Sequence, residues 1–108
     1  MGWYLYSEVK IMNFKGHILW ADDEIDMLKP HILYLEKKGY KVSPVNNGED
    51  AIHFCEDQNV DLVLLDEMMT GLDGLTTLKK IKEKHTSLPI IMITKNEEEW
   101  LMEEAIAA

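Results

Sequence analysis

Short apolar runs alternate with segments of helical periodicity four times along this chain, and no other feature restricts its possible folds as much. The apolar runs cover residues 17–21, 40–45, 60–65 and 90–94. After the first run, apolar residues recur at helical spacing, at Ile25, Leu28, Ile32 and Leu35. Strands that alternate with helices in this way form a parallel sheet with right-handed crossovers. The pattern therefore predicts a doubly wound α/β fold.

Two of the predicted strands can be placed in the sheet from their residue types. The run 60–65 is apolar almost throughout, which is typical of a central parallel strand that is buried on both faces. The run 40–45 contains Pro44, and because proline cannot donate to a strand ladder, this strand is expected at an edge.

The helical segments are bounded by typical start and stop residues. A helix over about 25–38 tolerates Pro30 only near its start, where the amides lack intrahelical partners, and Gly39 suits its end. Helices are also predicted over 49–57 and after Gly74. Asn96, followed three residues later by Glu99, resembles a capping box and predicts a fourth helix.

Charge and cysteine content exclude several classes of function. The formal net charge of -9 opposes direct binding to a nucleic-acid backbone. Cys55 is the single cysteine, so it cannot form an intramolecular disulfide or a thiolate zinc site, and it is expected to be buried. No apolar run approaches the roughly 20 residues that cross a bilayer. We expect a cytoplasmic protein that binds neither a membrane nor nucleic acid directly.

Acidic residues stand where the predicted strands end. Asp22 and Asp23 follow the first strand, Asp66 ends the third, and Thr94 ends the fourth. In a doubly wound sheet, functional residues gather at the carboxyl ends of the strands, where the strand order reverses. A single aspartate there is commonly only a helix N-cap, but the conjunction of all four residues favours a site. All-oxygen ligands suit Mg²⁺, and a metal beside Asp66 would suit aspartyl-phosphate chemistry with Thr94 as a hydroxyl donor.

These residues resemble the CheY-like receiver family of bacterial response regulators, over about 17–108. The family's acidic pair corresponds to Asp22-Asp23 in ILWADDE, and its phosphoacceptor corresponds to Asp66 in VDLVLLDEMM. The positions of Met69, Gly74 and Thr94 fit as well, as do Pro89 and the NNGEDA turn.

The resemblance implies four parallel strands in the order 2-1-3-4, numbered along the chain, and a signalling domain rather than an enzyme. Mg²⁺ would be bound by Asp23 and Asp66 directly, by Asp22 through water, and by the backbone carbonyl of Met68. Phosphoryl oxygens would meet Thr94 and the amides of Met68 and Lys95. The phosphodonor would be a sensor histidine kinase, and an output domain or protein would respond. Two stretches, LYLEKKGYKV and MITKNEEEWLMEEAI, are more narrowly similar to receivers with a PglZ-type output domain.

The sequence departs from the family pattern at two places. Thr70 stands where the family usually has proline, which is expected to loosen a loop. The sequence also stops at Ala108, before the family's fifth strand, its lysine and its fifth helix. We therefore expect an incomplete receiver over 15–108, preceded by an N-terminal extension over 1–14. The strand 90–94 would then leave an open edge, which either pairs with a second copy in a homodimer or is covered by the strand-like segment 4–11.

The sequence leaves one alternative of the same ancestry open and fits two other functions less well. A receiver without the lysine would serve only as an interaction module that is not phosphorylated. A Mg²⁺-dependent phosphatase of the haloacid-dehalogenase type usually has a second acid two residues after its nucleophile, where this chain has Met68. A flavodoxin-like cofactor binder needs a Ser/Thr/Gly-rich phosphate loop, and Asp22 and Asp23 occupy that position.

Overall fold

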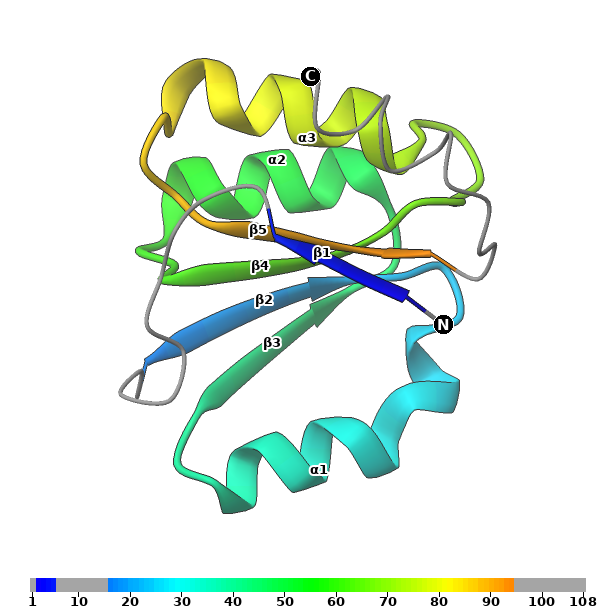
Figure 1. The fold of residues 1–108 in the computed structure, drawn as a ribbon, viewed down its shortest axis with the longest axis vertical. Coiled ribbons are helices and arrows are strands. Elements are labelled where there is room, and N and C mark those ends of the chain that lie inside the picture. Colours follow the sequence, from blue (N-terminus) through cyan, green and yellow to red (C-terminus); the bar gives the residue numbers. More distant parts are fainter. Residues whose placement is uncertain (1, 6–15, 95–108) are drawn as a thin grey trace.

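The computed structural model describes residues 2–5 and 16–94, which form one five-stranded sheet with helices on both faces (Figure 1). The sheet order is β1-β5-β4-β2-β3. The strands are β1 (Gly2–Leu5), β2 (His17–Ala21), β3 (Lys41–Val45), β4 (Leu62–Asp66) and β5 (Ile90–Thr94). Strands β2 to β5 are parallel and follow the predicted order 2-1-3-4. The doubly wound fold is thus confirmed.

The two strand placements made from residue types are also confirmed. All five residues of β4 are buried, as expected of a central strand. Strand β3, which contains Pro44, lies at one edge of the sheet and pairs only with β2. An edge strand has a partner on one side only, so proline is tolerated here better than in a central strand.

Strand β1 forms the opposite edge of the sheet and covers β5. It runs antiparallel to β5, with Gly2 opposite Thr94 and Leu5 opposite Ile91. Of the two predicted ways to cover the open side of strand 90–94, pairing with the N-terminal segment is the one observed. The strand occupies Gly2–Leu5 rather than starting at Tyr4, and residues 6–15 lie outside the described part of the chain.

The helices divide between the two faces of the sheet. Helices α2 (Gly48–Asp57) and α3 (Gly74–Lys84) lie on one face, and α1 (Lys29–Lys37) lies on the other (Figure 1). The first predicted helix is split in the structure: Ile25–Leu28 is a 3-10 helix (η2), and the α-helix begins only at Lys29. Pro30 falls in the first turn of α1, where its missing N–H costs nothing. The fourth predicted helix lies outside the described residues.

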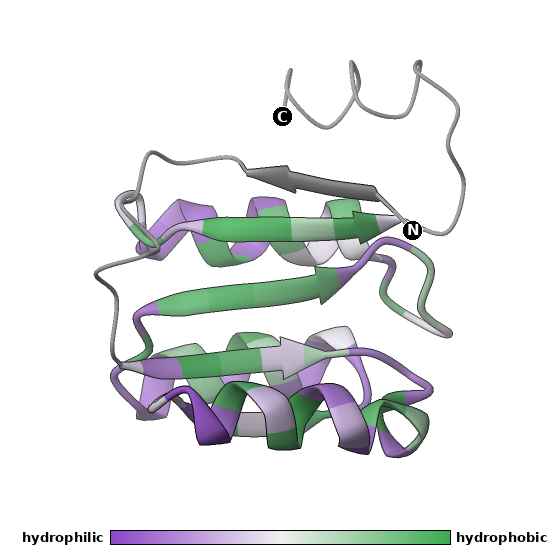
Figure 2. Ribbon diagram, turned by 60° about the horizontal axis from the view of Figure 1, so that its bottom comes forward, coloured by the Kyte–Doolittle hydropathy of each residue, from purple (hydrophilic) through white to green (hydrophobic). Residues whose placement is uncertain are grey.

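Each face of the sheet has its own hydrophobic core. Leu19, Leu65 and Met92 of the strands face α2 and α3. Cys55 of α2 belongs to the same cluster and is buried, as predicted. On the other face, buried side chains pack with Ile32 and Leu35 of α1. Coloured by hydropathy, β2 and β4 are apolar along most of their length, whereas the helices carry polar residues on their outer sides (Figure 2). In the described part of the chain, no helix combines the length and the apolar character needed to cross a membrane.

Candidate functional site

The register of the sheet brings the predicted site residues to the same level. Ala21 pairs with Leu65, so the next residues, Asp22 and Asp66, leave adjacent strands side by side. Asp66 lies opposite Ile93, which places Thr94 one residue further along the neighbouring strand. Parallel pairing therefore assembles at one end of the sheet residues that are far apart in the sequence.

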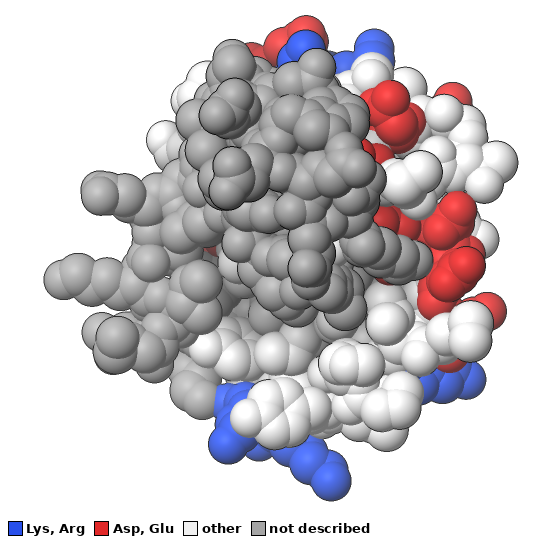
Figure 3. All heavy atoms as spheres, turned by 45° about the vertical axis from the view of Figure 1, so that its right-hand side comes forward, with Lys and Arg blue, Asp and Glu red and all other residues white. Residues whose placement is uncertain are grey.

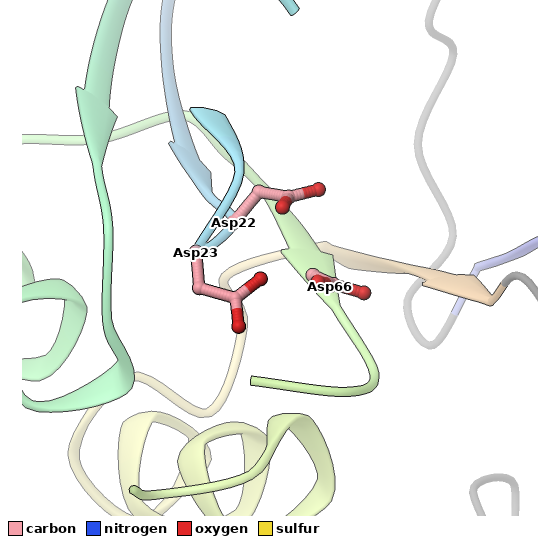
Figure 4. Close-up of side chains that lie close together, drawn as sticks. All are labelled: Asp22, Asp23 and Asp66. Atoms are coloured by element: carbon pink, nitrogen blue, oxygen red, sulfur yellow. The ribbon is translucent and has the colours of Figure 1, made fainter. Parts of the chain in front are cut away.

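Three carboxylates converge at this end of the sheet. Asp22, Asp23 and Asp66 each offer an oxygen, and these three oxygens lie within 4.8 Å of one another (Figure 4). Asp22 and Asp66 are buried, with 3% and 1% of their surface exposed, whereas Asp23 is exposed. Like charges at such separations repel, and burial removes much of the water that would screen them. A divalent cation with oxygen ligands would relieve that repulsion, so the donor set fits Mg²⁺.

The two buried carboxylates also organise the backbone that follows them. An oxygen of Asp22 accepts a hydrogen bond from the amide of Glu24 at 2.8 Å. Asp66 Oδ1 accepts one from the amide of Met68 at 3.2 Å. Both contacts join a side chain to the amide two residues later, a common way for aspartate to form a turn. These turns hold the acidic side chains and the loops around them in a fixed relation.

Asp23 is held from the other side of the site. Its Oδ2 accepts hydrogen bonds from both the amide and the hydroxyl of Thr70, each at 3.2 Å. Thr70 lies in the loop after β4, 47 positions further along the chain. The sequence interpretation expected this threonine only to loosen the loop, and it missed these contacts. The sequence gives no sign of this interaction, because Thr70 and Asp23 are far apart along the chain.

Thr94 is buried beside the carboxylates and engages a residue that the sequence analysis did not assign. Its hydroxyl donates a hydrogen bond to Glu67 Oε2 at 3.0 Å. The amide of Glu67 in turn donates to the carbonyl of Ile93 at 2.9 Å. Glu67 thus continues the pairing of β4 with β5, and its carboxylate binds the Thr94 hydroxyl. The only hint of this role in the sequence is that Glu67 directly follows Asp66.

A close backbone approach shapes the loop that begins at Asp66. A Cβ atom on Gly74 would lie 2.3 Å from the carbonyl oxygen of Asp66 and 2.7 Å from the Cα of Glu67. Only glycine therefore allows α3 to start against this loop. The amide of Gly74 donates to the carbonyl of Glu67 at 3.0 Å, and the side chain of Asp73 caps the helix through the amide of Thr76.

The surface around the site is acidic. Figure 3 shows acidic side chains gathered on the side of the molecule where the parallel strands end, with basic side chains toward its margins. Met68 is 65% exposed, so the loop after Asp66 presents an apolar side chain to solvent. This distribution agrees with the predicted preference for a cation over a nucleic-acid backbone.

The structure therefore brings together most of the predicted site residues. Asp22, Asp23, Asp66 and Thr94 are brought together at the carboxyl ends of β2, β4 and β5. The amide of Met68, expected to meet phosphoryl oxygens, now donates to Asp66. Lys95, whose amide was expected to help, lies outside the described residues.

Comparisons with known proteins agree with this arrangement. Residues 18–108 match the family model described as "Response regulator receiver domain". Transcriptional regulatory protein ResD of Bacillus subtilis is 42% identical over 82 residues, which are 76% of this chain and 34% of ResD. The alkaline phosphatase synthesis regulator PhoP of the same organism is 36% identical over 82% of this chain and 36% of its own length. The chain thus spans about a third of these relatives.

Solved structures show the same fold. The response regulator TrrA from Thermotoga maritima, in complex with Mg(2+)-BeF, superposes with a TM-score of 0.70 at 30% identity, over 83% of this chain and 80% of TrrA. A Francisella response regulator receiver domain gives a TM-score of 0.77 over 84% of this chain and 75% of its own. At 23% identity, this second likeness concerns the fold alone.

Proposed function

Because this chain belongs to the response regulator receiver domain family, we propose that it is a phosphoacceptor domain in which Asp66 receives the phosphoryl group. The observation that carries the proposal is the position of Asp66. It is buried at the end of the central strand, with carboxylate oxygens of Asp22 and Asp23 nearby and Thr94 on the adjacent strand. A carboxylate in this setting can act as a nucleophile once its charge is balanced.

We propose Mg²⁺ as the cation at this site. Asp22, Asp23 and Asp66 would hold it, with Asp22 acting through water, and the carbonyl of Met68 would complete the protein ligands. When bound, the ion supplies the positive charge that offsets the phosphoryl oxygens. The proposal is supported by the all-oxygen donor set and by TrrA, which is similar in fold and was solved with Mg(2+)-BeF.

The chain's own residues would handle the transfer as follows. A carboxylate oxygen of Asp66 attacks phosphorus, a new O–P bond forms, and the P–N bond of a phosphohistidine breaks. The bonding electrons leave with the imidazole nitrogen, which takes up a proton. The amide of Met68, which now donates to Asp66 Oδ1, and the hydroxyl of Thr94 are the donors nearest to the transferred oxygens. The donor would be a sensor histidine kinase.

The domain would act as a switch rather than as an enzyme. Phosphorylation would shift the population between two states of the surface around Thr94, and a partner would recognise one of them. The relatives are named as transcriptional regulatory proteins, which supports an output domain or protein as that partner. A PglZ-type output domain is the narrower proposal from the sequence. We also propose a cytoplasmic location, where histidine kinases present their phosphohistidine.

Phosphorylation by a small donor tests the proposal directly. The chain is incubated with Mg²⁺ and acetyl phosphate, and its intact mass is measured. We expect one hydroxylamine-labile phosphoryl adduct on the wild-type chain. It should be lost in Asp66→Asn and retained in the matched control Asp57→Asn, which changes an exposed aspartate at the end of α2.

An adduct that persists in Asp66→Asn would refute Asp66 as the acceptor. No adduct on the wild-type chain, in the presence of Mg²⁺, would favour the alternative of a receiver that acts only as an interaction module. Continuous release of inorganic phosphate at catalytic rates would instead support a phosphatase.

A further inference from the structure

We infer that Thr70 is a positioning residue for the metal site, because it holds the Asp23 carboxylate in the orientation that the cation requires. The inference rests on the proposed function, since it concerns the same Mg²⁺ site. It assigns a role to a residue that is outside the acidic cluster and that does not itself contact the metal.

The case begins with the different settings of the three aspartates. Asp22 and Asp66 are buried, at 3% and 1% exposure, and each is tied to an amide two residues further along its own loop. Asp23 is exposed, and it accepts its hydrogen bonds from Thr70 in a different loop. An exposed carboxylate exchanges between rotamers, and fixing one rotamer on metal binding costs entropy. Of the three ligands, Asp23 is therefore the one whose orientation most needs outside support.

Thr70 supplies that support through two donors to one oxygen. Its amide and its hydroxyl each lie 3.2 Å from Asp23 Oδ2. Such paired contacts select one rotation of the carboxylate and leave the other oxygen available to a ligand. Hydrogen bonds to an ionised group are also stronger than those between neutral groups. In metal sites, outer contacts of this kind typically change affinity by about 10- to 100-fold.

The surrounding loop allows Thr70 to reach across the site. Gly71, the next residue, has φ of +83°, a backbone conformation that is unfavourable for other residue types. The residue before Thr70, Met69, is anchored in the core beneath α2 and α3. Thr70 is thus placed between a buried anchor and a glycine turn, and it joins the loop after β4 to the loop after β2.

The type of residue at this position determines how many hydrogen bonds Asp23 receives from this loop. Proline, which the receiver family usually has here, carries no N–H and no hydroxyl, so it could make neither contact with Asp23. Serine would keep both donors, and valine would keep the amide while losing the hydroxyl. The serine, valine and proline substitutions therefore leave two, one and no hydrogen bonds to Asp23. None of them changes a proposed metal ligand.

The test is a titration of the full chain with Mg²⁺, in which binding is monitored through the amide signals in NMR spectra. We expect Thr70→Ser to bind Mg²⁺ within about twofold of the wild type, Thr70→Val about three- to tenfold more weakly, and Thr70→Pro more than about tenfold more weakly. In an Asp23→Asn background, Thr70→Val should have little further effect. Thermal unfolding of each metal-free variant serves as a control for the fold.

A second measurement needs no metal. In the metal-free chain, the Thr70 amide proton signal should shift when Asp23→Asn removes the charged acceptor. Mg²⁺ affinity in Thr70→Val that equals or exceeds that of the wild type would overturn the role of Thr70. If that result accompanied weakened binding in Asp23→Asn, the metal site itself would stand. If the wild-type chain failed to respond to Mg²⁺, both the inference and the proposed metal site would fall.

Discussion

At the scale of single residues, the Thr94 hydroxyl is committed to a neighbouring carboxylate before any phosphoryl group arrives. It donates to Glu67 Oε2 at 3.0 Å. A hydroxyl has one proton to donate, so it cannot serve Glu67 and a phosphoryl oxygen at the same time. Phosphorylation of Asp66 would therefore have to release Glu67. The same exchange would free the Glu67 carboxylate next to the surface that the proposed partner would recognise.

Removing the competing acceptor should speed formation of the phosphoaspartate. We expect Glu67→Ala to raise the rate of adduct formation from acetyl phosphate about threefold to tenfold, since the Thr94 hydroxyl no longer has to leave a charged partner. Glu67→Gln is the matched control because it keeps an acceptor oxygen and removes only the charge. Equal acceleration in both variants would show that the negative charge of Glu67, rather than its hydrogen bond to Thr94, slows phosphorylation. No acceleration in Glu67→Ala would refute competition between Glu67 and the phosphoryl group for the Thr94 hydroxyl.

At the scale of elements, β1 determines which strand forms one edge of the sheet. It pairs antiparallel with β5, whose other neighbour is β4. Without β1, one side of β5 would present unpaired backbone groups, and such an edge recruits strands from other molecules. We therefore expect deletion of residues 1–5 to cause concentration-dependent self-association in sedimentation velocity, while the full chain shows less at equal concentration. A truncated chain that stayed monomeric at every concentration would contradict this role of β1.

Single proline substitutions provide a matched control for the deletion. In an antiparallel pair, consecutive residues alternate between pointing their amide toward the partner strand and away from it. Trp3 and Tyr4 are consecutive and face Ile93 and Met92. One of Trp3→Pro and Tyr4→Pro should therefore remove a ladder hydrogen bond and promote association, whereas the other should have a smaller effect. Equal behaviour of the two variants would argue against backbone pairing as the cause.

At the scale of the whole molecule, Cys55 reports on the integrity of the core. It lies on α2 and is 5% exposed within the cluster between the helices and the sheet. Burial, with a smaller contribution from the charge of Glu56, raises the pKa of this thiol to about 11. The thiolate is the reactive form, so we expect Ellman's reagent at pH 8 to modify the folded chain slowly and the unfolded chain rapidly. Rapid modification of the folded chain would contradict this burial.

The same raised pKa predicts a pH dependence of stability. The neutral thiol is favoured in the folded state, so its contribution is fully present below pH 9.0 and is lost as the pH rises toward about 11. Denaturant titrations across this range should show a steeper loss of stability in the wild type than in Cys55→Ala. The variant provides the control because lysine and tyrosine side chains titrate in the same range. Identical slopes would refute the assignment.

Much of the fold was predictable because it depends on local patterns. The apolar run that became β4 and the proline in β3 determine which strands can be central and which must lie at an edge. The split of the first helix was not predicted, although Pro30 marked the point. An apolar periodicity of three to four residues is shared by 3-10 and α-helices, so it does not separate η2 from α1.

The sequence by itself determined the residue types of the site and the ends of the strands that carry them. Asp22, Asp66 and Thr94 could be grouped because parallel strands align their carboxyl ends. Only the tertiary structure decided that Thr70 holds Asp23, that Glu67 receives the Thr94 hydroxyl, and that β1 covers β5. Hydrogen bonds between loops depend on backbone direction and side-chain rotamers at positions far apart in the chain. No periodicity in the sequence encodes those contacts, because they arise only when the packed sheet brings the loops together.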